Sequence, residues 1–165
     1  MRLSQEEIET LAKTFKTLNM NPPQTALYAF AALQSDDALT ESIGERFTVN
    51  GRTVWALTGI TDKCLIRVRA SSACESWSWS SPGSEEDCKG EDVGGTLWPL
   101  SALRSLKVEG VRDITWQRES RQHLYDAAWV VTLRGGDQLA MPASEMSSPD
   151  DEGFNSLIAA IRSHI

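Results

Sequence analysis

The chain begins with apolar residues at helical spacing and changes to alternating apolar and polar positions near residue 45. In the first segment Ile8, Leu11 and Phe15 recur every three or four residues, which predicts an amphipathic helix with one buried face. Ser4 and Glu7 have the spacing of a capping box, in which each side chain bonds the other residue's backbone N–H. We therefore expect the first helix to begin directly after Ser4.

Two further helices are expected before residue 45. Asn21-Pro22-Pro23-Gln24 would restart the chain, with the asparagine as cap and a proline in the first turn. Residues 26–33 are apolar on nearly every side, which predicts burial by the body of the chain or by a partner. Leu39 and Ile43 continue the helical spacing, so a short third helix from Ser35 could end at Gly44.

From residue 45 the pattern predicts β-strands. Glu45–Asn50 and Arg52–Ile60 flank Asn50-Gly51, the dipeptide that most favours a type I′ hairpin turn. Residues 61–63 then turn the chain into a strand over residues 64–70. Further apolar runs predict strands at 96–100, around 106–116, at 124–133 and at 138–141, with a brief helical turn at 101–103. The total is about seven strands.

The last segment predicts an amphipathic helix. Ser148 and Pro149 have the cap and first-turn positions, and Asp150 and Asp151 suit the positive end of the helix dipole. One apolar stripe follows, formed by Phe154, Leu157, Ile158, Ile161 and Ile165. The expected fold class is therefore α+β, with N-terminal helices, about seven strands and a C-terminal helix.

This order of elements resembles the pleckstrin-homology-like (PH-like) superfamily, in particular its bacterial PH and GRAM-like members. Residues 56–68 are similar to a strand-turn-strand of that superfamily, 98–103 to a strand and turn, and 129–136 to a late hairpin. The resemblance covers residues 44–165, with a helical segment added at 1–43 and an acidic insertion containing Ser, Gly and Trp at 71–95. It implies a seven-stranded antiparallel barrel or sandwich capped by the C-terminal helix. It also implies a bacterial binding scaffold.

Charge and composition narrow the classes of function. The 165 residues fit one domain, and their net charge of −7 argues against nucleic acid as the main partner, because phosphate backbones need clustered Lys and Arg. Residues 44–70 alone lean basic, with five basic and two acidic groups. No apolar run approaches the ~20 residues that span a bilayer, and the first residues do not resemble a secretory signal. We expect a cytoplasmic protein.

The chain offers few groups for catalysis. His123 and His164 are its only histidines, and neither belongs to a metal or nucleophile motif. The spacing of Cys64, Cys74 and Cys88 does not match a zinc knuckle, so free thiols are expected, with a Cys74–Cys88 bond left open. We therefore expect a protein that is not an enzyme and that has no cofactor and no metal.

The predicted protein-binding surface centres on two tryptophans. Trp77 and Trp79 are two residues apart, so in an extended segment both indoles would point the same way. Tryptophan is enriched at interface hot spots, which favours contact with a protein partner. Leu27, Tyr28 and Phe30 of the apolar helix would add to this surface. Other interpretations stay open: the tryptophans lie in a disordered loop, or their indoles cover the body of the domain. The helix could likewise pack within the chain or contact a second subunit in a homo-oligomer.

An anionic ligand or a membrane surface is the alternative partner. PH domains that bind phosphoinositides do so with basic residues around the first hairpin, because several phosphate charges need several cations together. The corresponding residues here are Arg46, Arg52, Lys63 and Arg67.

Overall fold

A computed structural model describes residues 3–17, 19–74, 77–79, 92–113, 125–144 and 151–165. Predictions on the remaining residues, including His123 and the Ser148-Pro149 cap, lie outside this description. The elements in chain order are α1 (Gln5–Thr14), α2 (Gln24–Gln34), β1 (Leu39–Val49), β2 (Arg52–Thr61), β3 (Cys64–Ser72), β4 (Asp92–Pro99), the 3₁₀ turn η1 (Leu100–Ala102), β5 (Leu103–Asp113), β6 (Tyr125–Leu133), β7 (Gln138–Met141) and α3 (Asp151–Arg162).

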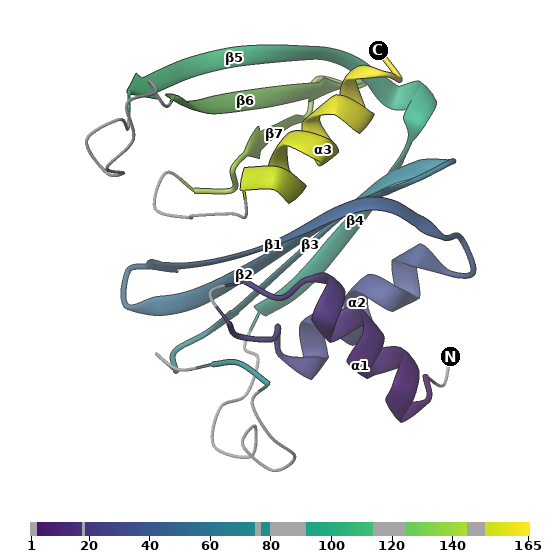
Figure 1. The fold of residues 1–165 in the computed structure, drawn as a ribbon, viewed down its shortest axis with the longest axis vertical. Helices are drawn as coiled ribbons and strands as arrows, with labels where there is room; N and C mark the ends of the chain where they lie inside the picture. Colours follow the sequence, from purple (N-terminus) through teal and green to yellow (C-terminus); the bar gives the residue numbers. More distant parts are fainter. Residues whose placement is uncertain (1–2, 18, 75–76, 80–91, 114–124, 145–150) are drawn as a thin grey trace.

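The seven strands form two antiparallel sheets, in the orders β1-β2-β3-β4 and β5-β6-β7 (Figure 1). Within each sheet every strand pairs with its neighbours in sequence, as in two successive meanders. Within the described residues no ladder joins β4 to β5 or β1 to β7, so the predicted barrel is not closed. The fold is α+β, with two helices before the strands and one after them.

Two local predictions are confirmed in the backbone. Ser4 Oγ accepts a hydrogen bond from the Glu7 N–H at 3.2 Å, and Glu7 Oε2 accepts one from the Ser4 N–H at 2.6 Å. The latter bond is the main cause that lowers the pKa of Glu7 below its ordinary value. In the β1–β2 turn Asn50 and Gly51 have φ angles of 51° and 73°, and a type I′ turn requires both to be positive.

The predicted third helix over residues 35–43 is wrong. α2 ends at Gln34, and β1 starts at Leu39, where it pairs with β2. The spacing of four residues between Leu39 and Ile43 is even, so it fits a strand as well as a helix. In the structure a register irregularity between Leu39 and Glu41 turns the two side chains to opposite faces, Leu39 toward the helices and Ile43 toward the second sheet. The helical part of the chain therefore ends nine residues before the predicted boundary, at 34 instead of 43.

The first sheet is covered on both faces. On one face α1 and α2 pack against it (Figure 1). There the rings of Phe15 and Phe30 meet edge-on with centroids 4.5 Å apart. On the other face Ile43 and Leu65 share a core with the second sheet and α3. Every residue of β2 after Arg52 is buried, so this strand lies at the centre of the molecule.

A glycine allows the end of α1 to reach the first sheet. A Cβ added to Gly44 would lie 2.0 Å from the backbone oxygen of Phe15, closer than real Cβ atoms approach a carbonyl. A backbone atom cannot move away as the end of a flexible side chain can. The contact between β1 and the chain after α1 therefore requires glycine at this position.

We expect Gly44→Ala to lower the free energy of unfolding by about 1–3 kcal/mol, the usual cost of forcing an extra methyl group into a packed site. Gly110→Ala in β5 is the matched control, because a Cβ there would meet no atom within 4 Å. Urea denaturation followed by tryptophan fluorescence measures both. Equal stability of the two variants would show that α1 does not pack closely on β1.

Candidate functional site

Trp77 and Trp79 point into the core of the chain. Their exposed fractions are 1% and 7%, and both indoles pack in the cluster that α1, α2, β2 and β3 form. The Trp55 indole N–H donates to the Trp77 carbonyl at 2.7 Å. The Trp79 N–H donates to the Asn21 carbonyl at 3.1 Å, and Asn21 Nδ2 donates to the Trp79 carbonyl at 3.3 Å. Asn21 thus holds the tryptophan segment, residues 77–79, while Pro23 takes the cap position of α2.

This burial changes the predicted protein-binding surface. The two indoles share one side, as their spacing indicated, but that side faces the core. Leu27 and Phe30 are fully buried as well. Tyr28, with an exposed fraction of 47%, is the member of the predicted set that a partner can reach in this structure. The other four side chains are core residues and do not form a binding surface in this structure.

The cysteines differ in state. Cys74 takes part in a disulfide bond, whereas Cys64 is a free, buried thiol. The expectation of free thiols is therefore wrong for Cys74, and Cys88 lies outside the described residues. The Trp77 N–H donates to the Cys74 carbonyl at 3.4 Å, so the covalent link lies directly before the tryptophan segment.

The four basic residues of the predicted anionic site do not converge. Arg67 is buried beside Glu45, on the face of the first sheet that turns to the second sheet. Arg46 directly follows Glu45 along β1, so its side chain leaves the opposite face. Arg52 is the first residue of β2, whereas Lys63 follows the other end of that strand. A phosphate group could not meet all four cations at once.

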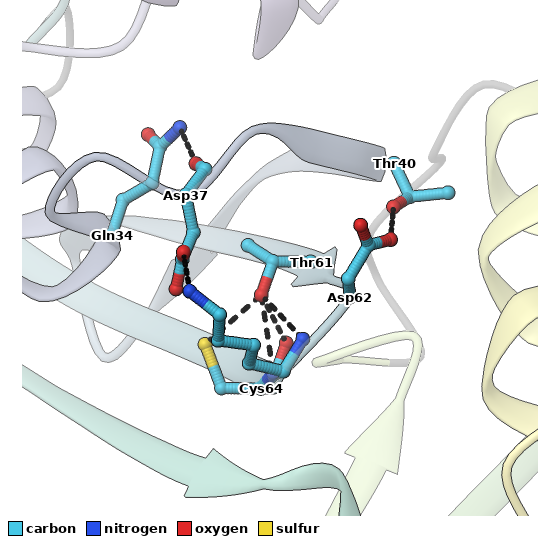
Figure 2. A network of polar contacts seen from close by, with 7 residues as sticks. Gln34, Asp37, Thr40, Thr61, Asp62 and Cys64 are labelled. Atoms are coloured by element: carbon cyan, nitrogen blue, oxygen red, sulfur yellow. Dashed lines mark hydrogen bonds and ion pairs between the residues drawn. The ribbon is translucent and has the colours of Figure 1, made fainter.

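Lys63 takes part in a polar network that joins two turns (Figure 2). Its ammonium forms an ion pair with Asp37, and this hydrogen bond is the main cause that raises the pKa of Lys63 above its ordinary value. Gln34 Nε2 donates to the Asp37 carbonyl at 2.8 Å. Thr61 Oγ1 accepts from the N–H groups of Lys63 and Cys64, both at 3.1 Å. These bonds close the β2–β3 turn and account for the network without a ligand.

A buried ion pair joins the two sheets. Arg67 Nη2 lies 3.0 Å from Glu45 Oε2, and the side chains are 9% and 0% exposed. Arg67 Nη1 donates to the Ala140 carbonyl at 2.9 Å, and the Ala143 N–H donates to Glu45 Oε1 at 2.7 Å. Burial lowers the pKa of Arg67, and the charge of Glu45 opposes that change. The pair connects β1 and β3 to β7 and to the residues after it.

Ala140 and Ala143, which bond to the ion pair, also line a groove of about 450 Å³ at one end of the second sheet. We call it the second-sheet groove. Its lining comes from β5, β6, β7 and the residues after β7, and it is mostly small and apolar: Glu109, Gly110, Val111, Ala127, Ala128, Trp129, Val130, Ala140, Met141, Pro142, Ala143 and Ser144. Val111 is 63% exposed, the largest value among the exposed large apolar side chains of the described residues. The sequence patterns did not indicate this site, because it depends on small residues that three strands bring together.

Neither a family model, nor a curated protein, nor a solved structure matches this chain. Among the described side chains no group of three or more His, Cys, Asp or Glu could hold a metal ion. In the same part of the chain no helix is both long and apolar enough to cross a membrane. His164 is exposed beside the C-terminus.

We expect Trp77→Ala to lower the free energy of unfolding by about 3–5 kcal/mol, because it empties a large buried site. Tyr28→Ala is the matched control, since it removes an exposed aromatic ring and should change stability by no more than about 0.5 kcal/mol. Thermal and urea denaturation of both variants measure the difference. A small loss for Trp77→Ala would show that the tryptophan segment does not form part of the core.

We expect Glu45→Leu or Arg67→Leu alone to cost about 3–5 kcal/mol, because each leaves one buried charge without its partner. The double variant should cost far less than the sum, since no uncompensated charge remains. The exposed pair Lys107–Glu109, at 3.9 Å, is the control, and Glu109→Ala should cost less than about 1 kcal/mol. Additive losses in the double-mutant cycle would show that the two buried charges do not interact.

Proposed function

We propose that this chain is a non-enzymatic, PH-like module that recognises a protein partner. In this proposal the second-sheet groove receives an apolar side chain from an extended segment of that partner. The observation that carries it is an open, mostly apolar groove whose lining includes Val111, an apolar side chain that is largely exposed.

The order of elements supports the PH-like part of the proposal. A four-stranded meander, a three-stranded meander and a C-terminal helix follow one another along the chain. The segments at 56–68, 98–103 and 129–136, which resemble the superfamily, fall on β2–β3, on the end of β4 with η1, and on β6 with the turn after it. The superfamily implies a binding scaffold.

The properties of the groove support a protein partner. Its volume of about 450 Å³ is in the range of ligand sites, roughly 300–1,000 Å³, and its walls are mostly apolar. Binding hot spots are commonly apolar anchors that fill such pockets. Glu109 at the lining favours a basic residue next to the anchor. The bonds from Arg67 and Glu45 hold the wall at Ala140 and Ala143, which reduces the ordering cost of binding.

The anionic-ligand or membrane-surface alternative has less support. Arg67 is buried in its pair with Glu45, and Lys63 is paired with Asp37. Arg46 and Arg52 lie on opposite faces of the first sheet. Phe47 and Val54 pair across the β1–β2 ladder and share one face. Arg46 is next to Phe47 and therefore points to the other face, whereas Arg52 is two residues from Val54 and shares its face. A cluster of cations, which phosphate recognition needs, is not found at the first hairpin.

We expect a random peptide library displayed on phage to yield binders with an apolar anchor residue. Val111→Lys should weaken the selected peptides at least about tenfold, a change of about 1.4 kcal/mol, because the new charge replaces an apolar contact beside the groove. Val49→Lys, at another exposed valine on the β1–β2 hairpin, is the control and should bind as the wild type does. Fluorescence polarisation with labelled peptides measures the affinities.

Two results would contradict the proposal. One is a selection without enriched peptides, or peptides that bind Val111→Lys as tightly as the wild type. The other is salt-sensitive co-sedimentation of the wild type with vesicles of anionic phospholipid, which would support the alternative function. We expect no such co-sedimentation at low or high salt.

A further inference from the structure

Two open sheets expose four edge strands, β1, β4, β5 and β7. Each edge has a row of N–H and C=O groups that can pair with another strand, and proteins usually protect such edges. Common protections are a cover of other residues, a short strand, a β-bulge, or charged side chains. The four edges of this fold differ sharply in how they are protected.

The outer strands β1 and β7 are protected by contacts within the chain. α3 packs along β1, and the Ala143 N–H donates to Glu45 on that strand. β7 has four residues, and the Ala140 carbonyl already accepts a hydrogen bond from Arg67. α3 thus covers part of β1, and β7 is too short to offer a long row of backbone groups.

β5 has two other protections. Its ladder with β6 has register irregularities between Leu103 and Ser105 and between Val108 and Gly110. Arg104, Lys107 and Glu109 place charges along the same strand, and all three are exposed. Bulges and charges both oppose pairing with a further strand.

Among the residues that the structure describes, β4 has none of these protections along its central part. Its ladder with β3 is continuous from Asp92 to Pro99, without a register shift. Residues 93–98 carry no charge, and every residue of β4 except Trp98 is exposed. Two large apolar side chains, Val93 and Leu97, are 39% and 41% exposed. Within the described residues β4 is therefore the least protected of the four edges.

We propose that β4 pairs in antiparallel register with β4 of a second copy of this chain, on a two-fold axis at Gly95. Residues equally far from Gly95 then face each other, so Val93 of one copy meets Leu97 of the other, and the same contact occurs twice. Val93, Gly95 and Leu97 lie on one face of the strand, which is the face toward α2, because a Cβ on Gly95 would lie 2.6 Å from Leu33 Cδ1. The two first sheets become one sheet of eight strands.

The self-complementary pattern favours a second copy over a foreign strand. A two-fold interface uses the same patch on both subunits, and the spacing of Val93 and Leu97 about Gly95 satisfies that condition. A register slip by one residue would place each apolar side chain against the opposite face of the partner strand. Two strands alone bury less than the roughly 1,200 Å² of a stable interface. The two copies of α2, which packs on β3 and β4, flank the join and add to the buried area.

Light scattering after size-exclusion chromatography tests this proposal over a series of concentrations. The wild type should reach twice the chain mass of 18.2 kDa. Val93→Lys and Leu97→Glu should each remain at 18.2 kDa, because each places a charge opposite an apolar side chain. An equimolar mixture of the two variants should recover the doubled mass. In the mixed pair the introduced lysine faces the introduced glutamate, while Leu97 of one chain faces Val93 of the other.

Val111→Lys is the matched control, because it adds the same charge at an exposed valine on the bulged edge and should keep the doubled mass. Circular dichroism confirms that the variants are folded. A wild type that stays at 18.2 kDa, a dimer that survives in either single variant, or a mixture that fails to recombine would overturn the proposal. The outcome is independent of the second-sheet groove, since Val111→Lys should affect peptide binding alone and Val93→Lys dimerisation alone.

Discussion

The burial of the first sheet on both faces is the constraint on which the rest of the structure depends. β2 is buried from Thr53 onward, so each of its faces needs an apolar cover. α1, α2 and the tryptophan segment provide one cover, and the second sheet with α3 provides the other. This requirement explains why the N-terminal helices pack on the sheet as part of its core. The same burial requires a hydrogen-bond partner for the Trp55 indole N–H, because a buried donor without a partner would cost about 1–3 kcal/mol. The Trp77 carbonyl is that partner.

The ion pair between Glu45 and Arg67 is the polar counterpart of that apolar packing. Two charges in a buried layer stabilise a fold only when all their groups find partners, and here Ala140 and Ala143 supply two of these bonds from the main chain. The pair therefore specifies where β7 and the following residues lie relative to the first sheet. Because the same residues form a wall of the second-sheet groove, the shape of the groove depends on charges that it does not expose. The buried ion pair and the second-sheet groove are therefore coupled through Glu45, Arg67, Ala140 and Ala143.

Local signals in the sequence predicted the elements well and their surroundings poorly. The capping box at Ser4 and the Asn50-Gly51 turn were readable because each depends on residues adjacent in the chain. The third helix was mispredicted because the spacing of four residues between Leu39 and Ile43 fits a strand as well as a helix. The tryptophan surface and the basic site could not be predicted, because the partners of Trp77 and Arg67 are 22 residues or more away in sequence. The groove gives no sequence signal, since small residues on three strands form it together.

The apolar edge of β4 has a partial explanation within the chain. Gly95 must stay small, because a side chain there would meet Leu33 and Val68, and a bulge would move that glycine away from α2. Packing of α2 therefore requires β4 to remain regular, which removes one common protection of an edge. It does not require Val93 and Leu97 to be apolar, because both side chains are substantially exposed and a charge at either position would be solvated. Charged residues at these two positions would have protected the edge without disturbing the core. That the chain has large apolar residues at both, equally spaced about Gly95, is what pairing with a second copy explains and packing within one chain does not.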